Sequence, residues 1–430
     1  MTKQTKQIPA FRFPEFERDG DWVEKRLGEV YRFLVTNSFS RAKLNYEDGE
    51  AKNIHYGDIH TKFSTLFDIT KEDVPFIDPD VSIQKIREEC YCMEGDIIFA
   101  DASEDMNDVG KSIEIINLNN EKLVSGLHTL MARQIEKKLV IGFGGYLFKS
   151  DYVRSQIQRE AQGAKVLGIS AGRISNIKIS FPRAHQEQQK IAGCLSSLDA
   201  LIAAHTDKLN AIKAHKKGLL QKLFPQEGER LPQVRFPEFE GEGDWVEKEF
   251  QKLCEVNPKV GGLPDEFVYV DLESVSNGML LKKNVIERNG APSRAKRLLK
   301  EKDVIYQMVR PYQKNNYYFI ESDNYEYVAS TGYAQLRAFG SSMFLFQLIH
   351  TDRFVSDVLL NCTGSNYPAI NSSSLKQIRV QIPPNPQEQQ KIATSLSAAD
   401  ELITAQQEKI EELQQHKKGL MQGLFPKIEN

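Results

Sequence analysis

The chain has 430 residues, of which 40% are hydrophobic and 27% are charged, and its formal net charge is −3. This composition excludes a mainly disordered or collagen-like chain, and the length predicts two to four domains of about 100–200 residues each. Because the chain is nearly neutral, any surface that binds nucleic acid must be local.

We expect no secretory signal at the beginning of the chain. Residues 1–16 are positively charged but lack the apolar core of a secretory signal. No run of about 18 apolar residues is present, so we expect no transmembrane helix. The five cysteines are scattered and form no CxxC pair, and the eight histidines lack metal-ligand spacing. These features indicate reduced thiols, a cytoplasmic protein and no metal site.

The chain contains an internal repeat that begins near each of two tryptophans. Residues 13–17 (FPEFE) recur at 236–240, and residues 21–25 (DWVEK) recur at 244–248, in both cases 223 positions later. A polar linker at 226–232 precedes the second copy. The chain is therefore a tandem duplication.

Each copy continues into a segment with the pattern of a mixed α/β domain. Alternating apolar residues predict half-buried strands at 96–99 and 177–181, and at the matching segments 303–306 and 378–382. Identity between the copies nearly vanishes here. Beyond this segment the offset between the copies falls to 201, so the second copy lacks about 22 residues.

Similarity returns in a segment that ends each copy. Residues 186–225 and 387–426 are identical at 23 of 40 positions, and neither contains proline before its last residue. Their apolar residues follow 4–3 spacing, which predicts helices of about 38 residues, or ~57 Å, that pair as an antiparallel coiled coil. The predicted seam consists of Ile191, Leu195, Ile202, Leu209, Ile212 and Leu219, and of Ile392, Leu396, Ile403, Ile410, Leu413 and Leu420.

Polar residues outside this seam are also identical in the two helices. A solvated face is free to change, so this identity predicts that both helices contact the same partner surface. The candidates for partner docking include Lys216 and Lys217 with their counterparts Lys417 and Lys418.

These segments predict an α/β (mixed α+β) fold with pseudo-two-fold symmetry. The expected divisions are a first globule at 1–185, a spacer helix at 186–225, a linker and second globule at 226–386, and a C-terminal spacer helix at 387–430. Two related but diverged globules on a rigid spacer are suited to contact two different DNA sequences separated by a gap.

Basic residues support DNA binding by the second globule. Residues 282–314 carry ten Lys or Arg and three acidic residues. Lys and Arg neutralise phosphates, and Arg, Asn and Gln hydrogen-bond to base edges. The alternative is a solvated basic face. The DNA-binding candidates here are Arg294, Lys296, Arg297, Arg310, Gln313, Lys314 and Asn366.

The first globule gives a weaker signal, because its acidic segment 101–108 repels phosphate. Its DNA-binding candidates are Arg41, Lys43, Lys52, Arg133, Lys165 and Arg173. Polar Gly loops are expected at the matching positions 163–175 and 364–374, where Ser, Asn and backbone N–H groups are further candidates for phosphate contact. Ordinary turns explain these loops nearly as well.

Catalytic motifs are missing. The segment 109–112 (VGKS) ends like a phosphate-binding loop, but Asp105 stands where that loop requires its first glycine. The glycines at 142–145 are better explained by a turn, and no Asn-Pro-Pro-aromatic methylase motif occurs. We therefore expect a recognition protein with no catalytic residues.

The duplicated DWVEK opening, the EQQKIA helix start and the HKKGL and LFP helix end resemble the specificity subunit of type I restriction–modification enzymes. The resemblance covers 11–226 and 234–427. It implies that each globule is a target recognition domain for half of a bipartite DNA sequence, and that the helices set the gap and dock two methyltransferase subunits. It further implies that partner subunits use S-adenosylmethionine, ATP and Mg²⁺, whereas this chain binds no cofactor.

Two other interpretations remain open from the sequence. One is a coiled-coil scaffold without DNA recognition, and the other is a self-sufficient nuclease or methylase, against which the missing motifs argue. The sequence leaves the target bases, the gap length and the presence of a restriction subunit open.

Overall fold

The computed structural model divides the chain into two compact units. Unit 1 comprises residues 1–205 and 409–430, and unit 2 comprises residues 206–408. Each unit contains one globule, the beginning of the long helix that follows it and the end of the other long helix, whereas the sequence suggested four consecutive segments. The residues that the structure describes are 8–259, 261–276, 278–320 and 323–427.

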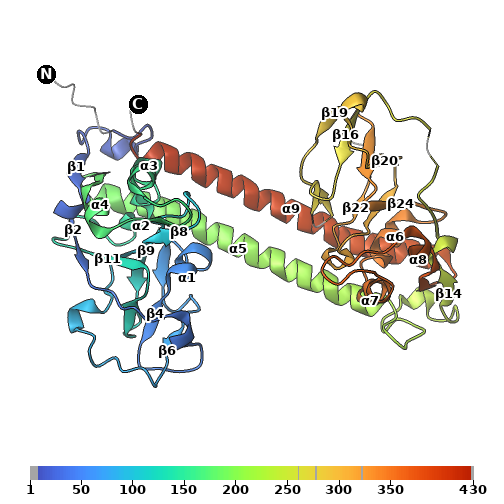
Figure 1. Ribbon diagram of the computed structural model, residues 1–430, viewed down its shortest axis with the longest axis horizontal. Coiled ribbons are helices and arrows are strands. Elements are labelled where there is room, and N and C mark those ends of the chain that lie inside the picture. Colours follow the sequence, from blue (N-terminus) through green and yellow to red (C-terminus); the bar gives the residue numbers. More distant parts are fainter. Residues whose placement is uncertain (1–7, 260, 277, 321–322, 428–430) are drawn as a thin grey trace. The chain divides into compact units, whose positions relative to one another are not determined.

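The globule of unit 1 contains a five-stranded and a four-stranded sheet (Figure 1). In spatial order, the larger sheet consists of β2 (Tyr31–Leu34), β11 (Thr129–Gln134), β7 (Ile97–Ala100), β9 (Ser112–Asn117) and β5 (Leu66–Asp68). The smaller sheet consists of β10 (Leu123–Ser125), β4 (Lys52–Ile54), β6 (Phe76–Ile77) and β3 (Leu44–Asn45). Neighbouring strands are antiparallel except in the β5–β9 and β10–β4 pairs.

The globule of unit 2 has a closely related arrangement of two four-stranded sheets. The first consists of β15 (Cys254–Val256), β24 (Tyr333–Ala338), β21 (Val304–Gln307) and β22 (Tyr317–Tyr318). The second consists of β19 (Val285–Glu287), β16 (Glu266–Val270), β23 (Tyr327–Ser330) and β20 (Ala295–Leu298). The predicted α/β class is confirmed.

Two-stranded ribbons complete both globules. In each unit one ribbon joins the strand after the tryptophan to the strand before the long helix: β1 (Val23–Arg26) with β13 (Lys178–Phe181), and β14 (Val246–Glu249) with β25 (Arg379–Ile382). The remaining ribbons are β8 (Ala102–Ser103) with β12 (Leu167–Gly168), and β17 (Val275–Ser276) with β18 (Met279–Leu280).

The central strands are more deeply buried than predicted. In β7, Ile97 and Phe99 face the core beneath the helices, whereas Ile98 and Ala100 face the core between the two sheets. All four residues of β7 and of β21 are buried. The prediction of half-buried strands is therefore wrong at these two places, because alternation of apolar side chains does not reveal that both faces of a strand are covered.

Three short helices pack against the sheet that contains β7 in unit 1 and against the sheet that contains β21 in unit 2. They are α2 (Phe143–Leu147), α3 (Asp151–Glu160) and α4 (Ala171–Asn176) in unit 1, and α6 (Ser342–Leu348), α7 (Asp352–Leu360) and α8 (Ser372–Gln377) in unit 2. Unit 1 also contains α1 (Tyr56–Thr61). The segments expected to be polar loops are only partly loops, because Ser170 and Asn371 cap α4 and α8 by accepting hydrogen bonds from backbone N–H groups.

The predicted long helices are present as α5 (His185–Leu223) and α9 (Pro386–Leu424), each with 39 residues. In unit 1, Ile191 near the start of α5 shares a core with Leu424 at the end of α9 (Figure 1). In unit 2, Leu223 at the end of α5 shares a core with Ile392 near the start of α9. Within each unit the helix segments therefore run antiparallel.

A buried ion pair attaches the beginning of each globule to the start of its long helix. Arg12 Nε and Nη2 donate to the two carboxylate oxygens of Glu187 at 2.8 Å, and Trp22 Nε1 donates to Glu187 Oε1 at 3.1 Å. The same contacts, at 2.8 and 3.2 Å, recur in unit 2 among Arg235, Trp245 and Glu388. We name this set of contacts among arginine, glutamate and tryptophan the Arg–Glu–Trp brace. It explains why the tryptophan motif and the helix-start motif are repeated together.

Candidate functional site

In each globule, a hairpin and the chain that follows the central strand form an exposed edge, here named the hairpin edge. In unit 1, Gln162 pairs with Gly168, which in turn pairs with Ala102 just beyond β7. In unit 2, Thr363 pairs with Ala369, which pairs with Val309 just beyond β21. The residues at the tips, 163–166 and 364–367, are exposed in both units. The two edges are thus structurally equivalent.

Four of the DNA-binding candidates lie at or beside the hairpin edge of unit 2. Asn366 is exposed at its tip, and the guanidinium carbon of Arg310 lies 4.2 Å from the centroid of the Tyr367 ring. Gln313 accepts a hydrogen bond from Gln307 at 2.8 Å. The fourth candidate, Lys314, donates to the carbonyl of His350 and to Asp352, both at 2.9 Å. Arg310 and Asn366 are therefore the more available of the four.

The other three candidates of unit 2 lie on a different sheet. Arg294 and Lys296 are exposed at β20. Arg297 is half-buried, its Nε has no hydrogen-bond partner among the described residues, and burial lowers the pKa of its guanidinium. The DNA-binding candidates within the basic segment 282–314 thus lie at two separate places, the hairpin edge and β20, and do not form one surface.

Arg133 is a structural residue of unit 1. Its Nε and Nη2 donate to Asp96 at 2.8 and 2.7 Å, and Nη1 and Nη2 donate to the carbonyls of Glu89 and Tyr91. The side chain is only 12% exposed. Nearly all of its donors are engaged within the globule, so Arg133 is among the least available of the DNA-binding candidates.

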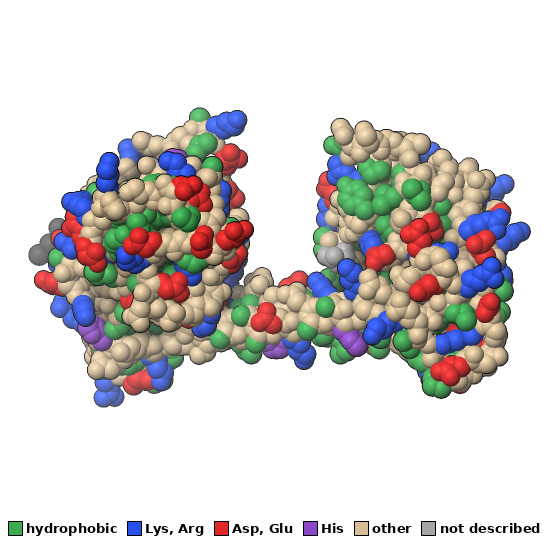
Figure 2. Space-filling model, turned by 90° about the horizontal axis from the view of Figure 1, so that it is seen from below, with side chains coloured by type: hydrophobic (Ala, Val, Ile, Leu, Met, Phe, Trp, Pro, Cys, Tyr) green, Lys and Arg blue, Asp and Glu red, His purple; other side chains and the backbone are tan. Residues whose placement is uncertain are grey.

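The remaining candidates of unit 1 are all on the surface or near it. Three of them form ion pairs: Arg41 with Asp58 at 2.7 Å, Lys52 with Glu121 at 2.6 Å and Arg173 with Glu160 at 3.2 Å. Lys43 and Lys165 are exposed. On the face shown in Figure 2, basic and acidic side chains are interspersed over both units. The candidates therefore differ in whether their charged groups are already paired within the globule, and not in the number of basic residues around them.

The seam of the long helices is most deeply buried near the globules. The buried positions are Ile191, Leu195 and Leu209, and Ile392, Leu396 and Leu413, of which Leu209 and Leu413 are the least buried. The half-buried positions are Ile202, Ile212 and Leu219, and Ile403, Ile410 and Leu420. A Cβ at Gly218 or at Gly419 would meet nothing within 4 Å, so close packing does not require glycine at either position.

Two lysines that were predicted to contact a partner instead form ion pairs within the chain. Lys216 Nζ donates to Asp400 Oδ1 at 2.5 Å in unit 2, and Lys417 donates to Asp199 in unit 1. The identity of these lysines in the two helices thus has an internal explanation. The next residues, Lys217 and Lys418, are exposed and remain candidates for docking.

Two exposed leucines were missed by the sequence analysis. Leu201 is 42% exposed and its counterpart Leu402 is 59% exposed. Each lies one residue before a seam position and was therefore hidden by the apolar pattern of the seam. The signal that could have identified them is an apolar residue outside the 4–3 spacing at the same position of both helices. An exposed apolar side chain repeated in this way is a candidate partner contact.

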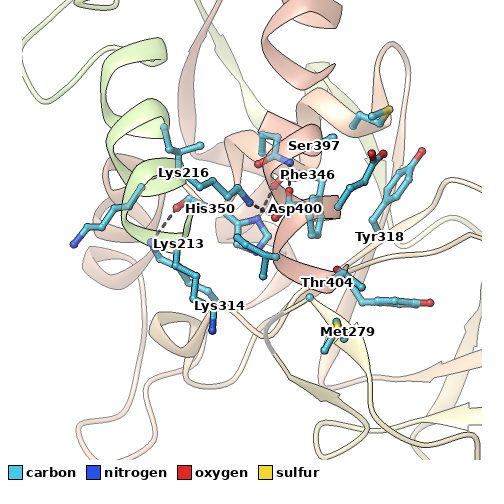
Figure 3. Close-up of a pocket in the computed structure, with 18 of the residues that line it drawn as sticks. Lys213, Lys216, Met279, Lys314, Tyr318, Phe346, His350, Ser397, Asp400 and Thr404 are labelled. Carbon is cyan, nitrogen blue, oxygen red and sulfur yellow. Dashed lines mark hydrogen bonds and ion pairs between the residues drawn. The ribbon is translucent and has the colours of Figure 1, made fainter. Parts of the chain in front are cut away.

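A cleft of about 880 Å³ lies in unit 2 between the two helix segments and the globule (Figure 3). Lys213 and Lys216 contribute from α5, Asp400 and Thr404 from α9, and Tyr318, Phe346 and His350 from the globule. Burial lowers the pKa of His350 to about 4, so its imidazole is neutral near pH 7. The seam residue Ile403 and the docking candidate Lys217 also line this cleft.

Two segments of the chain, residues 19–214 and 243–415, match the family described as the type I restriction modification DNA specificity domain. The chain belongs to this family. Proteins of this type are the non-catalytic specificity subunits of type I restriction systems, and catalysis belongs to other subunits.

Two curated members of the family from Methanocaldococcus jannaschii are similar to this chain. The putative type I restriction enzyme MjaX specificity subunit is 23% identical over 421 residues, which cover 94% of this chain and 93% of that protein. The type I restriction enzyme MjaVIII specificity subunit is 21% identical over 342 residues, which cover 68% and 72% of the two proteins.

Two solved structures share the fold. The type I restriction-modification S subunit from M. genitalium aligns with a TM-score of 0.59 at 12% identity over 98% of this chain and all of that chain. A chain from a study of type I R-M complex assembly and conformational transition aligns with a TM-score of 0.52 at 15% identity, over 94% and 97% of the chains. Within the described residues of this specificity-domain protein, no helix is both long and apolar enough to cross a membrane.

Proposed function

We propose that each globule of this specificity subunit recognises one half of an asymmetric, bipartite DNA sequence. The observation that supports this proposal is the contrast between the shared framework and the exposed edges. Both units have the same central sheet order and the same Arg–Glu–Trp brace, whereas the hairpin edges carry different side chains, such as Val166 and Tyr367 at the same position. Equivalent frameworks with different edges suit two unlike half-sites.

The long helices set the gap between the half-sites and dock two methyltransferase subunits. Matched exposed side chains on the two helices, Leu201 with Leu402 and Lys217 with Lys418, support a pair of equivalent docking surfaces. In this proposal the partner subunits hold S-adenosylmethionine, ATP and Mg²⁺, and their chemistry is adenine methylation and DNA cleavage. This chain contributes base recognition and spacing.

A coiled-coil scaffold without DNA recognition is not favoured. A scaffold role requires the helices but leaves the two large globules without a purpose. It also gives no reason for equivalent edges to differ in exposed side chains while the buried brace is identical.

The proposal is tested by mapping N6-methyladenine across the native genome with this gene intact and deleted. We expect methylation to disappear at one asymmetric motif made of two short sequences separated by an unspecified gap. Re-expression of the gene must restore that motif. An unchanged map, in cells where the partner methyltransferase is present and active, would show that another protein selects the target.

A further inference from the structure

The backbone of Arg310 is held in a conformation that arginine rarely adopts. Its φ of 54° and ψ of 55° lie in the left-handed region, which is unfavourable for a residue that carries a Cβ. Its N–H donates to the carbonyl of Pro368 at 2.7 Å, and its carbonyl accepts from the N–H of Gln313 at 3.0 Å. The hairpin on one side and the short 3₁₀ turn on the other therefore both fix this residue at the hairpin edge of unit 2. Non-glycine strain of this kind concentrates at functional sites.

The side chain of Arg310 contacts an aromatic ring but forms no ion pair with a described residue. Its guanidinium carbon lies over the ring of Tyr367, 4.2 Å from the ring centroid, and Tyr367 is itself 64% exposed at the tip of the hairpin. Its Nε is buried and has no hydrogen-bond partner among the described residues. Within the same part of the chain, no carboxylate pairs with Arg310, in contrast to Lys314 with Asp352. The cation–π contact thus holds the guanidinium at Tyr367 without using its terminal donors.

The equivalent edge of unit 1 lacks both members of this pair. The strand pairing aligns Gly168 with Ala369 and Ala102 with Val309, so Ser103 stands in the place of Arg310. In the same alignment Val166, which is 52% exposed, stands in the place of Tyr367. The position itself is accessible in both units, but only unit 2 presents a stacked guanidinium there.

We propose that Arg310, oriented by Tyr367, recognises a guanine in the half-site that unit 2 contacts. The proposal rests on the function proposed above and names one base contact within it. A guanidinium fork donates two parallel hydrogen bonds, and guanine presents the matching pair of acceptors, O6 and N7, in the major groove. A phosphate accepts the same fork, but phosphate contacts do not require a fixed guanidinium plane. The strained backbone and the aromatic support favour the base.

The test uses the complete complex of this chain with its methyltransferase partner and a library of randomised DNA sites. Bound or methylated sites are sequenced for the wild type and for Arg310→Ala, Tyr367→Leu, Ser103→Ala and Arg294→Ala. The wild type should require a guanine at one position of the unit 2 half-site. Arg310→Ala should relax that position and lower affinity for the cognate site by about tenfold to a hundredfold. Tyr367→Leu should weaken the same preference, and Ser103→Ala should leave it unchanged.

The outcomes separate this inference from the proposed function. Arg294→Ala removes the same charge from another DNA-binding candidate, at β20 on the other sheet of unit 2, so any loss of affinity that it causes should leave the preference for guanine intact. If Arg310→Ala lowers affinity equally for cognate and guanine-substituted DNA, Arg310 contacts phosphate and the inference is wrong. An unchanged preference, or a unit 2 half-site without guanine, would also overturn it while leaving bipartite recognition intact. If the wild-type complex shows no gapped motif, the proposed function itself fails. Methylation of sites with an intact unit 1 half-site verifies that each variant is folded.

Discussion

The side chains of Glu187 and Glu388 are each only 1% exposed, yet each carboxylate accepts three hydrogen bonds. Their guanidinium partners Arg12 and Arg235 are 7% and 8% exposed. Hydrogen bonding to Glu187 raises the pKa of Arg12, which shows that the charged forms stabilise each other. Removing one member of such a pair leaves an uncompensated buried charge, which costs far more than the pair contributes.

Glu388→Gln should therefore destabilise unit 2 selectively. The amide keeps the size of the side chain but leaves Arg235 without a counter-charge, so we expect a loss of about 3 kcal/mol. Hydrogen exchange should report the loss in the globule of unit 2, and Glu187→Gln should produce the same effect in unit 1. Glu401→Gln, on the exposed face of α9, is the matched control and should change stability by less than about 0.5 kcal/mol. Equal loss of protection in both units after one substitution would contradict two separate braces.

The glycines at 142–145 are explained by another buried carboxylate, that of Glu114. It accepts hydrogen bonds from the N–H groups of Gly142 and Gly145 at 2.9 and 2.6 Å, at the start of α2. Gly142 has a φ of 94°, and a Cβ on Gly145 would lie 2.9 Å from Leu66 and 3.2 Å from the carbonyl of Thr65. Glycine is thus required by backbone conformation at one position and by close packing at the other.

This carboxylate should make the stability of unit 1 depend on pH. Burial raises the pKa of Glu114 from its usual 4.5 to about 7. The folded state then binds a proton more tightly than the unfolded state, so stability falls as pH rises from 4.5 to 7 and is constant above that range. The expected loss is roughly 3 kcal/mol relative to Glu114→Gln, which does not titrate. Unfolding of unit 1, followed by hydrogen exchange at pH 5 and pH 8, measures the difference. A wild-type stability that rises over this interval relative to Glu114→Gln would refute the assignment.

The long helices were predictable from the sequence because each buries one continuous stripe, whose spacing is visible in the apolar residues alone. The sequence also showed that lysine occupies the matched positions 216 and 417, but it did not show why. A matched residue in two copies contacts either a common partner or an equivalent group inside the chain, and only coordinates identify Asp400 and Asp199 as the groups contacted.

The DNA-binding candidates were less predictable because they were selected by charge. Arg133 is neutralised by Asp96, 37 residues earlier in the chain, and a contact at that separation leaves no local signature. Conversely, the availability of Arg310 depends on a hairpin more than 50 residues later that brings Tyr367 beneath it. The composition thus located the basic segment, but the pairing of strands determines which of its side chains are exposed and unpaired.

The matched leucines of α5 and α9 give a separate test of docking. Leu402→Glu places a charge at the centre of the proposed surface on α9, and burying it against a partner should lower affinity for one methyltransferase subunit at least tenfold. Native mass spectrometry of the purified complex should show one bound methyltransferase subunit for each specificity subunit, in place of two. Leu201→Glu should remove the other copy, and the double variant both.

Leu360→Glu is the matched control for these substitutions, since Leu360 is 81% exposed but lies on α7 of the second globule. It should leave two methyltransferase subunits bound. Retention of both subunits by the double leucine variant would show that docking uses a different surface.

The chain divides into two compact units. The boundary between them crosses α5 after His205 and α9 after Glu408. Seven residues can therefore be inserted at both points without entering the core of either unit. A seven-residue insertion adds two helical turns, about 10.5 Å, and keeps the 4–3 spacing of the seam. If the helices set the gap, an extension of this size corresponds to about three base pairs at 3.4 Å each.

We expect methylation mapping of the double-insertion variant to return the same two half-site sequences with a gap longer by about three base pairs. Because DNA is helical, the added base pairs also rotate the second half-site about the axis, so affinity should fall even though specificity is retained. Insertion in α5 alone is the control, since it shifts the seam of one helix against the other and should lower stability instead of extending the gap. An unchanged gap in a folded double-insertion variant, or altered half-site sequences, would contradict the spacer role. Half-sites that persist at the longer gap would show that recognition belongs to the globules and spacing to the helices.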